Sequence, residues 1–182
     1  IETNPSVIFL ILGKTHPGVL KVDGEKYRNL LVTKIKELHL EEYVLFINQY
    51  LELSVLLDYL QLTDVYLFTS SDPNQAVSGT FVYAISCGCP IIATPIPHAL
   101  ELLSDDSGII FDFKDSSQLA VAVHHLLADE DLRTKMKLIG LQKTAATAWE
   151  NVAIAYTLLF QKTGKVKEEL IYSLPPIDTY HI

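Results

Sequence analysis

The chain has 182 residues, 49% of them hydrophobic, which is enough for one domain with a full core. A net charge of −8 and a pI near 5.1 argue against nucleic acid or an anionic membrane surface as a partner, because dense Lys and Arg hold such partners. No apolar run could span a bilayer, no signal peptide is visible and only two cysteines occur, so the sequence predicts a cytoplasmic protein without a transmembrane segment, free or at the cytoplasmic face of a membrane.

Apolar runs and amphipathic stretches alternate in the first part of the chain. Residues 7–12 form a continuous apolar run with the length of a buried parallel strand. Residues 24–38 place apolar side chains at helical spacing, with Lys and Glu on the other face. The predicted elements are a strand over 7–12, a helix over 24–38, a strand over 44–47, a helix over 53–62 and a strand over 65–68.

The loop after the first strand, residues 14–18, contains two candidate functional residues, Lys14 and His16. If the sheet is parallel, this loop lies at its carboxyl edge, where open α/β sheets bind ligands. The alternative is a surface turn with a solvated lysine and an incidental histidine.

Residues 70–95 form the stretch on which the functional interpretation depends. Turn-forming residues over 71–77 end the preceding strand, and Ser78 is a good N-cap for a helix that ends near Gly88. Gly79 and Thr80 leave bare amides in the first turn. Such a helix start suits an anion, since several N–H donors converge there and the helix dipole adds about half a positive charge. An N-cap without any ligand is the alternative.

The second half continues the alternation. Its predicted elements are a strand over 91–93, an irregular proline-rich segment over 94–98, helices over 100–103, 117–128, 131–137 and 149–160, and a strand over 108–111. Ser116 or Ser117 is expected to cap the second of these helices. Gly164 and the prolines at 175–176 indicate a linker, which predicts one domain over 1–163 and a linker or tail over 164–182.

Neither the cysteines nor the paired histidines suggest a metal site. Cys87 and Cys89 lack further Cys or suitably placed His for a structural zinc site, so two buried thiols are expected. His124 and His125 are adjacent and diverge by about 100° around a helix, so they cannot chelate one ion together.

Strands that alternate with helices throughout predict an α/β fold with a Rossmann-like, doubly wound parallel sheet. Gly-x-Gly-x-x-Gly is absent after the first strand, and no Gly-Lys-Ser/Thr phosphate loop occurs. The sequence therefore does not indicate a dinucleotide oxidoreductase or a protein with a P-loop phosphate site.

The order of elements and the run Ala-Ile-Ser-Cys-Gly-Cys-Pro-Ile-Ile-Ala-Thr-Pro over 84–95 resemble the C-terminal, donor-binding half of GT-B fold glycosyltransferases. The branch is retaining family four, also called group 1, and the resemblance covers residues 7–160. It implies one half of a GT-B fold in a hexosyltransferase of bacterial type that takes part in glycan biosynthesis. A nucleoside diphosphate sugar would be the substrate, with no cofactor and no metal, and the sugar would pass to an acceptor hydroxyl with retention.

In that family a pair of glutamates eight residues apart brackets this helix, the first on the donor sugar and the second on the ribose. The corresponding residues here are Gln75 and Tyr83, so both carboxylates are missing. Gln75 can still donate to and accept from sugar hydroxyls, and Tyr83 keeps a hydroxyl for the ribose. A variant site is therefore expected. Packing of Tyr83 in the core is the alternative.

The resemblance also implies roles for the other candidates. Amides at the start of the helix, at Ser78, Gly79 and Thr80, would stabilise the departing diphosphate. Lys14 and His16 would add charge or a hydrogen bond from the facing loop. The remaining candidates are Asn48, Gln49 and Tyr50 for the base, and His98 and Glu101 close to the site with no specified role.

Family members have a basic Arg/Lys pair and an N-terminal acceptor domain before the segment matched here, and this chain opens at Ile1 without a methionine. The sequence therefore predicts an excised donor-binding domain whose partners are a nucleotide sugar and the missing acceptor domain of the same polypeptide. Such a chain should fold alone, bind nucleoside diphosphates weakly and transfer no sugar. Because both glutamates are lost, a non-catalytic nucleotide-binding or scaffolding module is the alternative.

Overall fold

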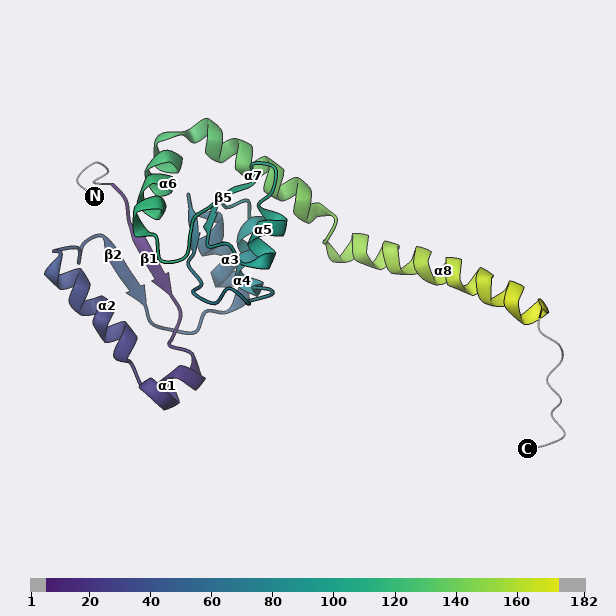
Figure 1. Cartoon of the computed structure of the whole chain (residues 1–182), viewed down its shortest axis with the longest axis horizontal. Coiled ribbons are helices and arrows are strands. Elements are labelled where there is room, and N and C mark those ends of the chain that lie inside the picture. Colours follow the sequence, from purple (N-terminus) through teal and green to yellow (C-terminus); the bar gives the residue numbers. More distant parts are fainter. Residues whose placement is uncertain (1–5, 174–182) are drawn as a thin grey trace. The chain divides into compact units, whose positions relative to one another are not determined.

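The computed structural model describes residues 6–173, and side chains as far as residue 164. Contacts within the chain divide it into two compact units, Ile1–Asp58 (unit 1) and Tyr59–Ile182 (unit 2). Both units combine helices with a parallel sheet (Figure 1). The predicted α/β class is confirmed, and the described strands form two hydrogen-bonded sheets, one in each unit.

Unit 1 is built on a two-stranded parallel sheet in which Leu12 of the first strand lies opposite Ile47 of the second. The helices between these strands contain no fully buried residue. Its elements are β1 (Phe9–Leu12), α1 (Pro17–Asp23), α2 (Lys26–Glu37) and β2 (Val44–Ile47), with α3 (Leu53–Gln61) across the boundary with unit 2.

The predicted loop over 14–18 is wrong at its second half, because α1 begins at Pro17. Proline fits the first helical position, since its missing N–H would have no helical partner there. The His16 side chain caps this helix by accepting from the Gly18 N–H, with 3.1 Å between the two nitrogens. Gly24, at φ +61°, ends it, so the predicted helix over 24–38 begins at Lys26 instead.

Unit 2 is built on a three-stranded parallel sheet in which β4 is the central strand and is buried along its whole length. Ile92 of β4 packs in one apolar cluster with Phe111, Leu126 and Met136. The elements of unit 2 after α3 are β3 (Tyr66–Phe68), α4 (Gly79–Ser86), β4 (Ile91–Ala93), α5 (Pro97–Leu102), β5 (Gly108–Ile110), α6 (Ser116–Ala128), α7 (Glu130–Ala145) and α8 (Trp149–Ser173).

Several predicted boundaries in unit 2 are wrong. The segment over 94–98 is irregular only as far as Ile96, because α5 begins at Pro97 and includes His98. The cap of α6 is Asp115, whose carboxylate accepts from the Gln118 N–H at 2.8 Å, so neither Ser116 nor Ser117 is the cap. Asp129 caps α7 in the same way.

The last two helices are longer than the sequence predicts. The helix expected over 131–137 continues to Ala145, and the one expected to end at Phe160 runs through Gly164 to Ser173. The prolines at 175–176 lie outside the described residues, and the domain limits of 1–163 and 164–182 remain predictions. No described helix is both long and apolar enough to cross a membrane.

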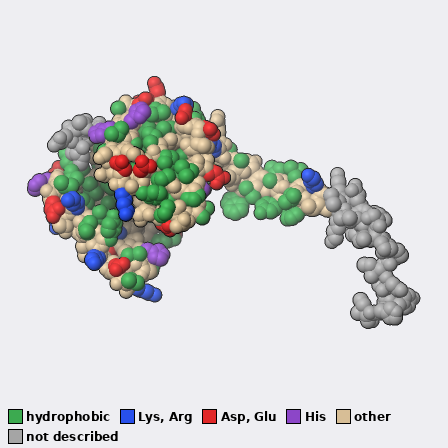
Figure 2. Space-filling model, in the orientation of Figure 1, with side chains coloured by type: hydrophobic (Ala, Val, Ile, Leu, Met, Phe, Trp, Pro, Cys, Tyr) green, Lys and Arg blue, Asp and Glu red, His purple; other side chains and the backbone are tan. Residues whose placement is uncertain are grey.

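The final helix exposes many apolar side chains. Figure 2 shows hydrophobic groups along α8, and Trp149 and Phe160 are 85% and 65% exposed. Among the described side chains of this helix, only Val152 is half-buried. The described part of α8 therefore contributes little to the core of unit 2.

Candidate functional site

The parallel pairing of β3 with β4 brings two loops of unit 2 to one edge of its sheet. Phe68, the last residue of β3, lies opposite Ala93, the last residue of β4. The loop that leads to α4 and the segment that leads to α5 therefore leave the same end of the sheet. The Ser78 N–H donates to His98 Nδ1 across this edge, with 3.3 Å between the nitrogens.

The start of α4 has the predicted cap. Ser78 Oγ accepts from the Phe81 N–H at 3.4 Å and lies 3.2 Å from Thr80 Oγ1. The hydroxyl of Tyr66, which was not predicted as a site residue, donates to Thr80 Oγ1 at 3.1 Å. The phenol is protonated at neutral pH and can donate this bond, and burial raises the pKa of Tyr66 above its ordinary value of 10.0, so the bond persists further into alkali.

The backbone amides of Gly79 and Thr80 have no partner among the described residues, and both residues are exposed. The Ser78 amide is not available in the same way, because His98 accepts its hydrogen. Two bare N–H groups at a helix start can hold one oxyanion, since the donors converge and the helix dipole adds to them.

Gln75 is part of the hydrogen bonding of its own loop. Its Oε1 accepts from Ser70 Oγ at 2.6 Å, and its Nε2 donates to the Val77 carbonyl at 3.4 Å. A primary amide has two N–H groups and two lone pairs on oxygen. One donor and one acceptor position therefore remain on Gln75 for a ligand.

Tyr83 and Glu101 lie on the helices that follow. Tyr83, on α4, is 39% exposed and its hydroxyl has no partner among the described residues, which does not fit simple core packing. Glu101, on α5, is exposed. No hydrogen bond joins either side chain to Ser78 or His98.

The five candidates of unit 1 lie at one edge of its own sheet. Because Leu12 pairs with Ile47, the loops after β1 and β2 leave the same end. The residues brought to that edge are Lys14, His16, Asn48, Gln49 and Tyr50, all of them exposed. The His16 Nδ1 is already used as the cap of α1.

Arg28 is a residue of this region that the sequence did not reveal. Its guanidinium donates to the Gly13 carbonyl at 2.9 Å and to Thr15 Oγ1 at 3.3 Å, and it pairs with Glu25 at 3.4 Å. It also lies 5.2 Å from the Phe46 ring centroid. Arg28 therefore fixes the loop that contains Lys14. The spacing of Glu25 and Arg28 on a helix signals an ion pair but not these loop contacts.

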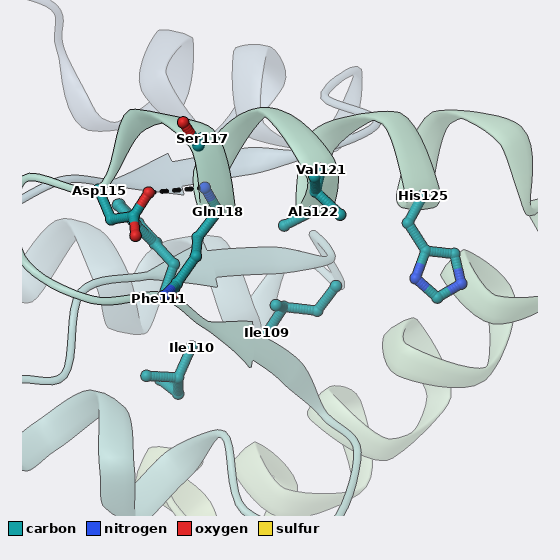
Figure 3. A pocket seen from close by; sticks show the side chains of 9 residues that line it. All are labelled: Ile109, Ile110, Phe111, Asp115, Ser117, Gln118, Val121, Ala122 and His125. Atoms are coloured by element: carbon teal, nitrogen blue, oxygen red, sulfur yellow. Dashed lines mark hydrogen bonds between the residues drawn. The ribbon is translucent and has the colours of Figure 1, made fainter.

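A separate open pocket of about 460 Å³ lies between β5 and α6. Figure 3 shows Ile109, Phe111 and Ala122 on its apolar walls, with Asp115 and Gln118 joined by their hydrogen bond at one end. None of the predicted site residues lines this pocket.

The described residues contain no group of three or more His, Cys, Asp or Glu that could hold a metal ion. Cys87 and Cys89 are both free thiols, and only Cys89 is fully buried, so the expectation of two buried thiols is half right. Burial raises the pKa of Cys89 to about 12, which keeps that thiol protonated.

Comparison with solved structures shows the fold. The chain is similar to the C-terminal domain of a group 1 glycosyl transferase, LpcC, from Francisella tularensis, with a TM-score of 0.68 at 20% identity over 80% of this chain and 71% of that one. It is also similar to Anabaena Alr3699/HepE, solved in complex with UDP, with a TM-score of 0.69 at 23% identity over 85% of this chain and 41% of that one.

Comparison of sequences shows the family. D-inositol 3-phosphate glycosyltransferase from Corynebacterium urealyticum is 29% identical over 110 residues, which are 60% of this chain and 26% of the relative. The chain thus spans about a quarter of the length of that relative. The sequence model of the family described as glycosyl transferases group 1 matches residues 1–142, a span that includes the α4 helix start and every described strand. This chain therefore belongs to the group 1 glycosyl transferases.

Proposed function

We propose that this chain is the donor-binding part of a hexosyltransferase that moves a sugar from a nucleoside diphosphate sugar to an acceptor hydroxyl with retention. The observation on which this rests is the start of α4, where the amides of Gly79 and Thr80 are exposed and unpaired beside the Ser78 hydroxyl. Family membership supports a diphosphate as the anion, and HepE, which has a similar fold, was solved with UDP and with UDP-glucose.

The amides at the helix start would act on the leaving group. Negative charge builds on the diphosphate as the bond to the anomeric carbon breaks, and donors already in place stabilise this charge without reorganisation. One of the Ser78 and Thr80 hydroxyls donates to the other, so the remaining hydroxyl proton can be donated to the same oxygens. This supply of donors supports transfer without a metal ion. The bacterial relatives, from Corynebacterium urealyticum and Francisella tularensis, support a role in glycan biosynthesis of bacterial type.

The remaining roles are assigned by chemistry. The free N–H and lone pair of Gln75 suit donor-sugar hydroxyls, and the unpaired hydroxyl of Tyr83 suits the ribose. Lys14 and His16 would contribute charge or a hydrogen bond to the donor. We assign recognition of the base to Asn48, Gln49 and Tyr50. We assign Glu101 to the surroundings of the donor, without a specified role.

Transfer would need further protein. An acceptor hydroxyl must be held about 3 Å from the anomeric carbon, and we assign this task to an acceptor-binding domain in the same polypeptide. The chain spans 41% of HepE and 26% of the inositol phosphate glycosyltransferase, which supports this assignment. The free thiols fit a reducing compartment, so we place the protein in the cytoplasm.

Replacement of Gly79 tests the phosphate site. A Cβ at Gly79 would meet nothing within 4 Å, so Gly79→Val leaves the fold unstrained but blocks close approach of a phosphate. We expect calorimetry with UDP and GDP to show at least about a tenfold loss of affinity, or about 1.4 kcal/mol. Gly164→Val is the matched control, because Gly164 also lies in open space on a helix. Equal affinity in all three chains would refute the phosphate assignment.

Two further measurements test the metal independence of the site and the choice between an active and a non-catalytic domain. Binding that survives EDTA supports the metal-independent site, and binding abolished by EDTA contradicts it. The 182-residue chain should show no sugar transfer by itself. Sugar transfer by the full-length polypeptide that contains this chain, if Gly79→Val in that polypeptide abolishes it, supports the transferase. Nucleotide binding by the full-length polypeptide without any transfer favours a scaffolding module.

A further inference from the structure

We propose that Gln75 and His98 together fix the peptide between Val77 and Ser78, and so position the amides of α4 that would receive the diphosphate. This inference rests on the proposed function and deepens it. It gives His98, which has no assigned role, the part of a positioning residue. We call the group formed by Gln75, this peptide and His98 the peptide clamp.

Both polar ends of one peptide plane are held by side chains. The Val77 carbonyl accepts from Gln75 Nε2 at 3.4 Å, and the Ser78 N–H donates to His98 Nδ1 at 3.3 Å. The two partners come from opposite sides in sequence, one from the loop before α4 and one from α5. A peptide plane held at both ends cannot rotate without loss of both hydrogen bonds, so the direction in which the chain enters α4 is fixed.

The ring of His98 is itself held in place. It packs against Phe81 with 5.4 Å between ring centroids, and Phe81 packs edge-on against Phe68 at 5.5 Å. Phe81 is fully buried, so this row of rings joins β3, α4 and α5 from inside the core. Packing of the imidazole against a buried ring leaves Nδ1 directed at the Ser78 amide.

The hydrogen bond also fixes the tautomer of His98. An imidazole nitrogen that accepts a hydrogen bond carries no proton, so in the neutral ring the proton is on Nε2. His98 in this state accepts from the backbone and does not act as a general base through Nδ1. Its contribution to donor binding is therefore indirect, through Ser78.

The clamp explains why glutamine at position 75 suits this chain. The group that faces the Val77 carbonyl must be a hydrogen-bond donor, and a glutamate carboxylate would place an acceptor there. Two acceptors at this distance repel each other. A glutamine also has a second N–H and a second lone pair, so it can hold the loop and still bind a ligand.

The first test compares His98→Phe with His98→Asn in the 182-residue chain, with UDP and inorganic pyrophosphate as probes. Phenylalanine keeps the ring packing but has no acceptor, whereas the Asn Oδ1 can accept near the position of Nδ1. We expect His98→Phe to weaken both probes by about tenfold, as loss of one ordinary hydrogen bond would, and His98→Asn to stay within about threefold of wild type. Circular dichroism checks that both variants fold.

The second test is a double-mutant cycle with Gln75→Met, which keeps the length of the side chain without its N–H. Because Gln75 and His98 act on one peptide, the double variant should bind pyrophosphate more tightly than the product of the two single losses predicts.

A third test is spectroscopic. Imidazole ¹⁵N spectra of the wild-type chain should show the His98 proton on Nε2, a signature that a purely structural packing role would not require.

The outcomes distinguish this inference from the proposed function. Wild-type affinity in His98→Phe, equal losses in His98→Phe and His98→Asn, independent losses in the cycle, or a proton on Nδ1 would each overturn the clamp. A wild-type chain that binds pyrophosphate but not UDP contradicts the proposed function alone, because the His98 comparison still proceeds with pyrophosphate. A wild-type chain that binds neither probe contradicts both.

Discussion

The strands of the two units are similar in sequence but differ in how completely they are buried. The strands of both are short apolar runs, yet Ile91 and Ile92 in unit 2 are completely buried, while Phe9 and Leu10 in unit 1 are 44% and 37% exposed. Every buried residue of the described chain lies in unit 2, and none lies between residues 6 and 58. An apolar run thus predicts a strand but not how completely it is buried.

The difference in burial follows from the number of strands and helices that pack around each strand. The central strand β4 has a neighbour on both sides, and α6 packs against it while α4 and α6 pack on α7. In unit 1, β1 and β2 have only each other as hydrogen-bonded neighbours. A two-stranded sheet is marginal in water, because too little apolar surface leaves the solvent to offset the loss of chain entropy. We therefore expect unit 1 to open more easily than unit 2.

The largest contrast should come from truncation of one isoleucine in each unit. Ile92→Ala leaves a cavity in the apolar cluster of unit 2 and should lower the free energy of unfolding by about 2–5 kcal/mol. Ile11→Ala removes a half-buried side chain from unit 1 and should cost less than half as much. Urea unfolding followed by hydrogen exchange of each unit measures both. Equal losses would show that the two cores are equally well packed.

Arg28→Met should have the next largest effect and should act on unit 1. It removes the hydrogen bonds to Gly13 and Thr15 and the pair with Glu25, for a loss of about 2 kcal/mol. Lys34→Met is the control, since its pair with Glu37 is exposed and worth less than about 0.5 kcal/mol. Faster amide exchange over 13–16 in Arg28→Met but not in Lys34→Met is the expected readout, and unchanged exchange in both would refute the role of Arg28.

Removal of one helix cap should give a smaller effect confined to unit 2. Asp129→Ala frees the Leu132 N–H at the start of α7 and should cost about 1 kcal/mol. Asp131→Ala, in the same turn but exposed, should change the free energy of unfolding by no more than about 0.5 kcal/mol. Hydrogen exchange in unit 1 should be the same in both variants. A change there would mean that the units do not open independently.

The smallest effect at neutral pH, and one that grows in alkali, concerns the thiol of Cys89. Its pKa is raised from 9.0 to about 12 by burial, so the folded state retains a proton that the unfolded state loses. Stability from this source is complete below pH 9 and is lost as the pH rises from 9 toward 12. We expect Cys89→Ala to flatten the fall in stability between pH 9 and 10, and Cys87→Ala to flatten it less, because burial raises the pKa of Cys87 too but its side chain is only half-buried. Identical pH profiles for wild type and Cys89→Ala would contradict this.

The same thiol reports on the opening of unit 2. Cys89 is buried and Cys87 is half-buried, and both are free. Iodoacetamide should therefore modify Cys87 first and Cys89 only when unit 2 opens, because the thiolate is the reactive species.

Much of the fold could be predicted from the sequence because its signals are local. Apolar runs located all five described strands to within two residues, and Ser78 was identified as an N-cap from its own residue type and the residues after it. The errors have local causes too. Pro17 and Gly18 are typical of a turn but begin a helix. Gly164 is typical of a helix end but lies inside α8, because the neighbouring helical residues outweigh the cost of one glycine.

The sequence by itself determined the α/β alternation, the capped start of α4 and the family, since these depend on residue types a few positions apart. Tertiary structure alone decided which strands are buried and what holds the candidate loops. The Ser78 amide meets His98 twenty residues later, and Arg28 reaches Gly13 fifteen residues earlier. A hydrogen bond across such a separation forms only after packing brings the segments together, and no local pattern encodes that distance.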